Sequence, residues 1–155
     1  MKGPLGLVTF SVGGRRMALA LGSVERVVAM VEVTPLPHAP DVVLGAVDVA
    51  GEAVPVFDVR RRLGLDGDAY GADAVLMLAH TDRRAVAVAA DAIGEVREID
   101  PAAVAPADAL APGLEHLAGV AALDDGLLLI QDLDAFLTAD EERRLALAEA
   151  EAARV

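Results

Sequence analysis

Short apolar runs, separated by turns rich in glycine or charge, follow one another along most of the chain. The run Leu7–Val12 is followed by Gly13-Gly14 and then by the strand-like segment Arg15–Leu21. Glycine accepts the positive φ that a tight turn requires, so this pattern predicts a β-hairpin. A second hairpin is predicted where Val75–Ala79 and Val86–Ala89 flank a polar turn.

The two hairpins begin an internal repeat. Four further segments recur in the same order: Val24–Val27 is matched by Ile93–Val96, Gly45–Val47 by Gly119–Ala121, Ala53–Phe57 by Leu127–Ile130, and Asp58–Leu63 by Asp132–Leu137. We place the copies at residues 5–63 and 74–137, with the segment rich in Gly and Asp between them as the linker. Two copies are too few for a solenoid. They predict two small, similar β-barrels side by side within a single domain, residues 1–155.

Helical structure is expected at three places. Asp58 and Asp132 are placed to cap single helical turns, because a carboxylate accepts from exposed backbone N–H groups. Thr138 and Glu141 form the pattern of a capping box, which predicts a C-terminal helix over 138–155. Because Leu145 and Leu147 do not share a face, we expect this helix to pack lightly and to fray.

Charge and composition exclude several classes of function. Acidic residues outnumber basic ones 25 to 13, for a net charge of −12, which argues against a nucleic-acid partner. The cluster Arg60-Arg61-Arg62 has no aromatic companions, so we interpret it as solvated. There is no cysteine, no pattern of a secretory leader and no apolar run long enough to cross a membrane. We therefore expect a cytoplasmic protein without direct membrane insertion.

The sequence contains no recognisable catalytic, metal or cofactor motif. His38, His80 and His116 lack a second ligand at helical spacing and are interpreted as ordinary loop residues, with His116 at the surface. Ser11 and Ser23 lie outside any nucleophile-elbow pattern. We expect a non-enzymatic protein that binds no cofactor. Small apolar strands such as residues 85–90 either pack internally or offer a smooth surface to a partner, and a binding role is favoured for the protein as a whole.

The segment Thr34–Leu65, TPLPHAPDVVLGAVDVAGEAVPVFDVRRRLGL, resembles the signature region of CheW-like coupling proteins. In that family the region contains spaced prolines, Asn-hydrophobic-Arg-Gly, Val-Pro-Val-hydrophobic-Asp and a basic turn with leucine. The resemblance extends in order to Phe10–Leu21, Val24–Val28, Val86–Val96 and Gly119–Leu137. Each motif alone is weak, but the ordered set is specific.

The resemblance implies a mainly β fold of two intertwined five-stranded SH3-like barrels, with short helical turns and a C-terminal helix. It also implies a non-catalytic adaptor between the cytoplasmic tip of a chemoreceptor and the regulatory domain of a CheA-type histidine kinase. Adaptor, kinase and other CheW-like proteins are expected to associate in rings. The receptor tip is expected to lie in a groove between the barrels, as a helix in an apolar groove.

Site residues are carried over from the same resemblance. The receptor groove is expected to be lined by Val24, Arg26, Val28, Asp48, Val49, Ala50, Gly51, Val88, Ala90 and Ile93. The kinase interface is expected near Val54, Pro55 and Val56 in the first barrel and near Leu114 and Leu117 in the second.

Two positions depart from the family pattern. Asp48-Val49-Ala50-Gly51 lacks the family's arginine, and Arg26 stands where the family often has an acid. We hypothesise that Arg26 and Asp48 form a rearranged ion pair. Such a surface pair is typically worth about 0.2–1 kcal/mol, so it would affect partner choice more than stability.

Three alternatives stay open. The protein could self-associate through its barrel ends, or bind only one of receptor and kinase in a pathway other than motility. A small-ligand-binding barrel is the least favoured, because only 3% of the residues are aromatic.

Overall fold

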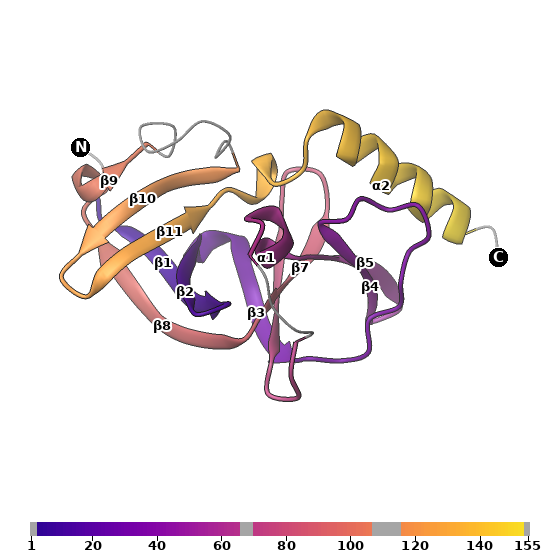
Figure 1. Ribbon diagram of the computed structural model, residues 1–155, viewed down its shortest axis with the longest axis horizontal. Helices are drawn as coiled ribbons and strands as arrows, with labels where there is room; N and C mark the ends of the chain where they lie inside the picture. Colours follow the sequence, from indigo (N-terminus) through magenta and orange to yellow (C-terminus); the bar gives the residue numbers. More distant parts are fainter. Residues whose placement is uncertain (1–2, 66–69, 107–115, 154–155) are drawn as a thin grey trace.

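Two β-sheets make up most of the computed structural model, which describes residues 3–65, 70–106 and 116–153 (Figure 1). In spatial order, sheet A contains β8 (Ala92–Ile99), β1 (Leu5–Val12), β2 (Arg15–Ala20), β11 (Gly126–Gln131), β10 (Leu117–Leu123) and the two-residue β9 (Val104–Ala105). Sheet B contains β3 (Val24–Ala29), β6 (Val75–His80), β7 (Ala85–Ala90), β5 (Glu52–Phe57) and β4 (Val43–Val49). The sheets form two lobes, and the chain termini lie at opposite ends of the molecule.

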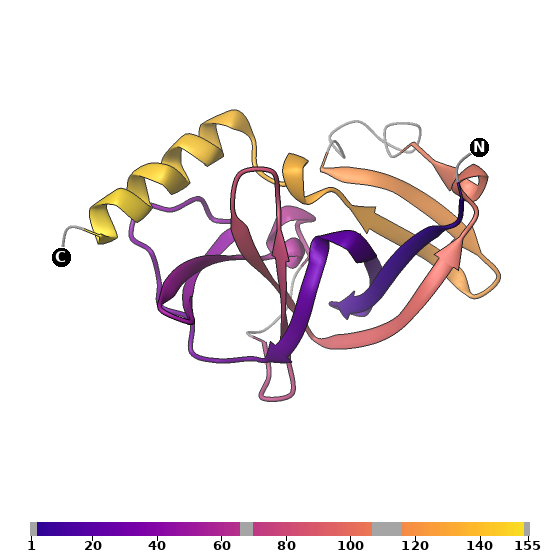
Figure 2. The ribbon, with the colours of Figure 1, turned by 180° about the vertical axis from the view of Figure 1, so that it is seen from behind.

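Each sheet combines strands from both halves of the chain. In sheet A, β2 runs parallel to β11, with Met17 opposite Leu129. In sheet B, β5 runs parallel to β7, with Val56 opposite Ala87. All other pairings are antiparallel, and β8 curves away from the centre of the molecule along the sheet A lobe (Figure 2). The predicted fold of two intertwined SH3-like barrels is confirmed, and we call them barrel A and barrel B after their sheets. Sheet B has the predicted five strands, whereas sheet A has six, because the two-residue β9 adds a strand beside β10.

The locally encoded elements form where the sequence predicts them. Gly13 and Gly14 adopt φ values of 58° and 76° in the β1–β2 turn, a conformation that costs other residues energy. β6 and β7 form the second hairpin. Asp58 caps α1 (Val59–Arg62), and Asp132 caps the 3₁₀ turn η4 (Leu133–Ala135).

The described part of the chain contains three further helical elements: the 3₁₀ turns η1 (Leu21–Ser23) and η2 (Pro101–Ala103), and the C-terminal helix α2 (Ala139–Ala152). The capping box of α2 is confirmed. The Glu141 amide donates to Thr138 Oγ1 at 3.1 Å, and the Thr138 amide donates to Glu141 Oε1 at 2.9 Å.

One apolar core joins the two barrels. It contains β1 and β2 residues of sheet A, residues of β5, β6 and β7 of sheet B, and side chains that follow β11. At its centre the rings of Phe57 and Phe136 stack with centroids 4.5 Å apart. Val88 and Ala90 of β7 are fully buried in this inter-barrel core. The side chains of β7 from Val86 to Ala90 therefore pack internally, and only Ala85 at the start of the strand is exposed.

Helix α2 packs more firmly than its composition predicts. Leu145 is fully buried in the inter-barrel core and Ala148 is buried beside it, whereas Leu147 is 65% exposed. Because a single large side chain on the correct face is enough to anchor the helix, the expectation of light packing was wrong.

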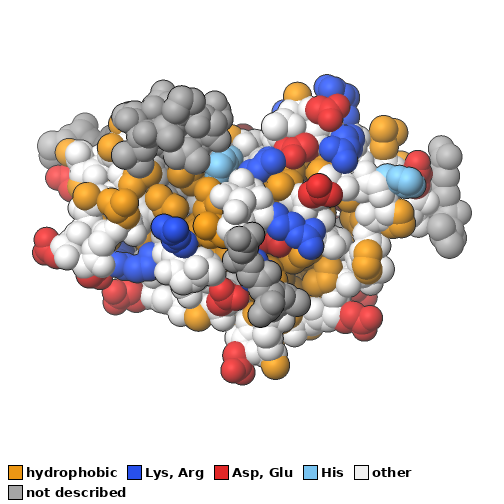
Figure 3. All heavy atoms as spheres, in the orientation of Figure 1, with side chains coloured by type: hydrophobic (Ala, Val, Ile, Leu, Met, Phe, Trp, Pro, Cys, Tyr) orange, Lys and Arg blue, Asp and Glu red, His pale blue; other side chains and the backbone are white. Residues whose placement is uncertain are grey.

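Ion pairs also fasten α2 to barrel B. Arg62 of α1 contacts Glu141 at 2.6 Å, and Arg84 of the β6–β7 turn contacts both Glu142 and, at 2.6 Å, Glu149. Basic and acidic side chains accordingly lie side by side over the start of the helix (Figure 3). Arg62 is half-buried and paired, so the interpretation of the arginine cluster as solvated is wrong for this residue.

His116 also departs from expectation. It is 8% exposed and not at the surface, because its backbone carbonyl accepts from the Asp132 amide at 3.0 Å and holds β10 against the turn after β11. His38 and His80 are exposed, as expected of loop and strand-end residues.

Candidate functional site

A cavity of about 230 Å³ opens between β3 and β4, the two edge strands of sheet B. It is lined by Arg26, Val28, Val31, Val47, Asp48, Val49, Ala50, Leu76 and Leu78. Five of these are among the predicted receptor-groove residues. We call it the β3–β4 cavity; its floor is the apolar interior of barrel B, where Leu76 and Leu78 are buried.

Strand β3 forms one wall through a change in register. A β-bulge between Val24 and Arg26 brings Arg26 opposite Leu78 and Val28 opposite Leu76. Cross-strand partners share one face of a sheet, so both β3 residues face the cavity. Val28 is half-buried against the barrel interior, and Arg26 is exposed at the rim.

The β4–β5 turn forms the opposite wall. Ala50 and Gly51 adopt φ values of 51° and 90° in a two-residue turn, and the Gly51 amide donates to Asp48 Oδ1 at 2.9 Å. The left-handed conformation costs an alanine about 1–2 kcal/mol, which the turn geometry imposes on Ala50. The carboxylate of Asp48 thus stabilises the turn.

The hypothesised Arg26–Asp48 ion pair is not formed. Both side chains line the cavity, but no ion pair within 4.0 Å joins them. Arg26 therefore presents an unneutralised guanidinium at the cavity rim.

The remaining predicted groove residues are dispersed. Val24 is half-buried against the inter-barrel core, Gly51 is exposed in the turn, and Ile93 lies 41% exposed on β8 of the other sheet. The expectation for Val88 and Ala90 was wrong, because the space between the barrels is filled by core packing that includes both. The open site lies at the edge of one barrel.

The predicted kinase contacts are also corrected. Val54 and Val56 are 4% and 0% exposed in the interior of barrel B, Pro55 is buried, and Leu117 is 6% exposed. Leu114 lies outside the described residues. An apolar run in a strand cannot by itself distinguish a core strand from a contact surface. Here Val54, Val56 and Leu117 belong to the core.

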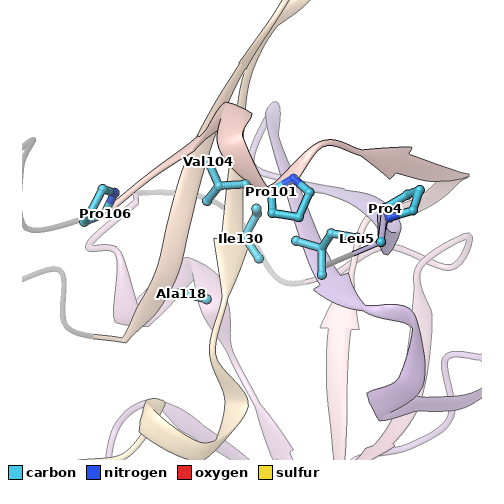
Figure 4. A pocket seen from close by; sticks show the side chains of 8 residues that line it. Pro4, Leu5, Pro101, Val104, Pro106, Ala118 and Ile130 are labelled. Atoms are coloured by element: carbon cyan, nitrogen blue, oxygen red, sulfur yellow. The ribbon is translucent and has the colours of Figure 1, made fainter. Parts of the chain in front are cut away.

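A second apolar cavity, of about 430 Å³, lies at one end of barrel A (Figure 4). Its lining residues come from the start of β1, from η2 and β9, and from β10 and β11: Gly3, Pro4, Leu5, Pro101, Val104, Pro106, Ala118 and Ile130. We call it the proline cavity. This cavity was not predicted from the sequence, and its one visible signal there is the local density of proline.

The edges of the sheets expose apolar side chains. Among the described residues, seven large apolar side chains are exposed, and five of them lie in or beside β3 and β8: Leu21, Val27, Val31, Ile93 and Val96. Such side chains on unpaired edge strands are typical of interaction surfaces.

Two further features are absent from the part of the chain that the structure describes. No group of three or more His, Asp or Glu side chains there is arranged to hold a metal ion. Within the same residues, no helix is long and apolar enough to cross a membrane.

Comparison with known proteins shows which family the chain resembles over most of its length. A family model described as the CheW-like domain matches residues 6–141. The chemotaxis protein CheW of Rhizobium meliloti is 26% identical over 137 residues, covering 87% of this chain and 88% of that protein. Protein FrzA of Myxococcus xanthus is 32% identical over 115 residues, covering 72% of this chain and 70% of that protein.

The fold agrees with a solved structure. The scaffolding protein TtCheW from Thermoanaerobacter tengcongensis matches with a TM-score of 0.81 at 24% identity, covering 90% of this chain and 96% of that one. The ordered motifs, the two intertwined barrels and the family match over residues 6–141 all agree. The chain belongs to the CheW-like family.

Proposed function

We propose that this protein is a non-catalytic chemosensory adaptor that couples the cytoplasmic tip of a chemoreceptor to the regulatory domain of a CheA-type histidine kinase. Family membership and the chemotaxis and scaffolding names of its relatives support this role. The observation that carries it is the β3–β4 cavity, where five predicted receptor-contacting residues surround an apolar floor.

The β3–β4 cavity suits an amphipathic receptor helix. Val28 and Val49 offer half-buried apolar walls above Leu76, so an apolar side chain of the helix can be desolvated there. Arg26 at the rim has no carboxylate partner among the described residues, so it can form an ion pair with an acidic side chain of the helix. Contacts of this kind affect partner choice and association rate more than total affinity.

The proline cavity is our candidate for the kinase. It lies in the other barrel, so receptor and kinase can bind at the same time. Its wall is apolar and rigid in backbone, because proline fixes φ. It adjoins Leu117 through the exposed Ala118, close to the segment where the family resemblance predicts the second-barrel contact.

The test uses one substitution in each cavity. Val28→Asp places a carboxylate in the β3–β4 cavity, and Ala118→Asp places one in the proline cavity. Calorimetric titration of each full-length variant with a receptor-tip helical hairpin, and separately with a kinase regulatory domain, should show that each variant loses one partner only. Leu147→Asp on the exposed face of α2 is the matched control and should bind both.

Each other result has a definite reading. Unchanged receptor binding by Val28→Asp would overturn the receptor assignment, and unchanged kinase binding by Ala118→Asp would overturn the kinase assignment. If the unmodified protein bound neither and instead formed concentration-dependent oligomers, the self-associating scaffold would replace the adaptor.

A further test concerns the two departures from the family pattern. Arg26→Glu and Ala50→Arg, made singly and together, should change receptor affinity, because both side chains line the β3–β4 cavity. Because both positions line one small cavity and the new side chains carry opposite charges, we expect the two effects to be non-additive in free energy. No change in either receptor or kinase affinity would contradict the assignment.

A further inference from the structure

A third cavity, of about 480 Å³, lies beside α1 and contains two arginines. It is lined by Met30, Val31, Val33, Leu44, Arg60, Arg61, Leu65 and Tyr70. Its size falls within the range of about 300–1,000 Å³ that is typical of small-molecule sites. We call it the Arg60 cavity.

Arg60 stands apart from the other arginines. Arg16, Arg62, Arg84 and Arg97 are half-buried like Arg60, and each of them has a carboxylate within 4.0 Å. In the described part of the chain, Arg60 is the one half-buried arginine without such a partner. A partly desolvated guanidinium with free donors is costly unless an anion pairs with it. None of the acidic residues that the structure describes pairs with Arg60, so its donors are available to an anion bound in the cavity.

The guanidinium is also held in position. It lies 4.3 Å from the centre of the Tyr70 ring, a cation–π arrangement that orients its plane. The Tyr70 hydroxyl donates to Asp58 Oδ1 at 2.8 Å, so the ring itself is fixed. Burial, followed by the Asp58 charge, raises the pKa of Tyr70, and the phenol therefore adds no negative charge to the cavity.

The neighbouring charges favour a monoanion. Arg61 is partly committed, with its Nε 3.4 Å from Asp58 Oδ2 and a donor 2.8 Å from the Asp41 carbonyl. Asp58 and Asp91 are close enough to affect the Tyr70 pKa, and Asp91 accepts from the Gly13 amide at 2.8 Å. The two guanidinium groups and the two carboxylates balance in charge, so a monoanion placed on Arg60 meets less repulsion than a dianion would.

The opposite wall is apolar. Met30, Val33 and Leu44 are half-buried and pack on the interior of barrel B, leaving part of each side chain toward the cavity. A ligand that satisfies both walls needs a single anionic group and a hydrocarbon body.

We propose that the Arg60 cavity binds a small amphipathic carboxylate, with its head group on Arg60 and its hydrocarbon body against the apolar wall. The Arg60 cavity shares only Val31 with the lining of the β3–β4 cavity, and its test contains neither receptor nor kinase. Its failure would therefore leave the adaptor role untouched.

The experiment is an NMR or calorimetric titration of the full chain with sodium octanoate. Octanamide, which has the same hydrocarbon body and no charge, is the matched ligand control, and inorganic phosphate tests whether any anion suffices. We expect saturable one-to-one binding of octanoate, with octanamide weaker by about tenfold or more, as for loss of a charge-assisted hydrogen bond. Phosphate should not compete.

Variants assign the binding to the cavity. Arg60→Gln should weaken octanoate about tenfold or more, whereas Arg144→Gln, which removes an exposed arginine of α2, should leave it unchanged. Val31→Asp provides a second test at a residue that is 50% exposed, so this variant should fold even if Arg60→Gln does not. It should also weaken octanoate by placing a like charge in the wall.

Three results would overturn the proposal. These are no saturable binding of octanoate below about 10 mM, equal binding of octanoate and octanamide, and unchanged affinity in folded Arg60→Gln and Val31→Asp chains.

Discussion

The two barrels differ most at the edge where a hairpin turn faces a neighbouring strand. In barrel A, Asp125 of the β10–β11 turn pairs with Arg16 of β2 at 3.0 Å and with Arg97 of β8 at 3.4 Å. In barrel B, Asp48 beside the β4–β5 turn caps that turn, and Arg26 of β3 stays unpaired across the cavity.

The two barrels have similar architecture, but ion pairs bridge the edge of barrel A, whereas no ion pair joins Arg26 and Asp48 at the edge of barrel B. Exposed ion pairs contribute little to stability, so the difference concerns access. The open edge combines an apolar floor with a free guanidinium, which is why we assign the receptor to barrel B. Two properties of the molecule can be tested: whether the two barrels unfold together in one transition, and whether their edges differ in the restraint that an ion pair provides.

The largest effect is expected from Phe136→Ala. Phe136 is fully buried and stacks on Phe57 in the core that both barrels share. Its truncation should lower the free energy of unfolding by about 3–5 kcal/mol. Because the core is common, urea unfolding followed by circular dichroism and by NMR signals of each barrel should remain a single transition.

Leu147→Ala is the control for this prediction, since Leu147 is 65% exposed and its loss should change stability by less than about 0.5 kcal/mol. Two separate transitions, one for each barrel, would show that the barrels are independent units.

The elements that depend on neighbouring residues were predictable from the sequence. The Gly13-Gly14 turn, the caps at Asp58 and Asp132, and the Thr138–Glu141 capping box all depend on interactions within a few residues. Their chemistry is visible in the local pattern, and each is confirmed.

The pairing of distant segments was not predictable in the same way. The β3–β4 cavity needs β3 to pair with β6 in a register that includes a bulge. The anchoring of α2 needs Arg62 to meet Glu141, 79 residues later. Val88 and Val56 were assigned to surfaces by the family resemblance, and the apolar pattern of their strands could not correct this, because periodicity alone cannot distinguish a shared core from an interface.

The turn that closes the open edge gives the next prediction. Ala50 holds φ at 51°, a conformation that glycine adopts without strain. Ala50→Gly should raise the free energy of unfolding by about 0.5–1 kcal/mol, the relief of strain being partly offset by the freer unfolded chain. Ala53→Gly, in the adjacent strand, should lower it by about the same amount. A decrease for Ala50→Gly would contradict the strained turn.

Acidification should weaken the attachment of α2 to barrel B. The Arg62 guanidinium bonded to Glu141 holds the pKa of that carboxyl below its usual 4.5. A carboxyl with a lowered pKa in the folded state contributes stability above pH 4.5, and this contribution is lost as the pH falls through the folded-state pKa. The effect should be small, because the pair is partly exposed to solvent.

The measurement compares the unmodified chain with Glu141→Gln in urea. The difference between their midpoints should be constant above pH 4.5 and should shrink below it. If the difference between the midpoints stayed constant through the acidic range, the ion pair between Arg62 and Glu141 would not contribute to stability.

The smallest effect, and the most direct test of the two edges, comes from matched aspartate-to-asparagine changes. The bond from Arg16 is the main cause of a lowered pKa at Asp125, so this carboxylate is ionised and bridges β2 and β8. Asp125→Asn should leave the urea midpoint unchanged and should speed amide hydrogen exchange in β8, because an edge strand loses a restraint. Asp48→Asn should not alter exchange in β3, since an asparagine oxygen still accepts from the Gly51 amide and no ion pair is lost. If amide hydrogen exchange became faster by the same factor in β3 and β8, Asp48 would restrain barrel B as Asp125 restrains barrel A. The difference in charge between the two edges would then not explain why only the edge of barrel B is open.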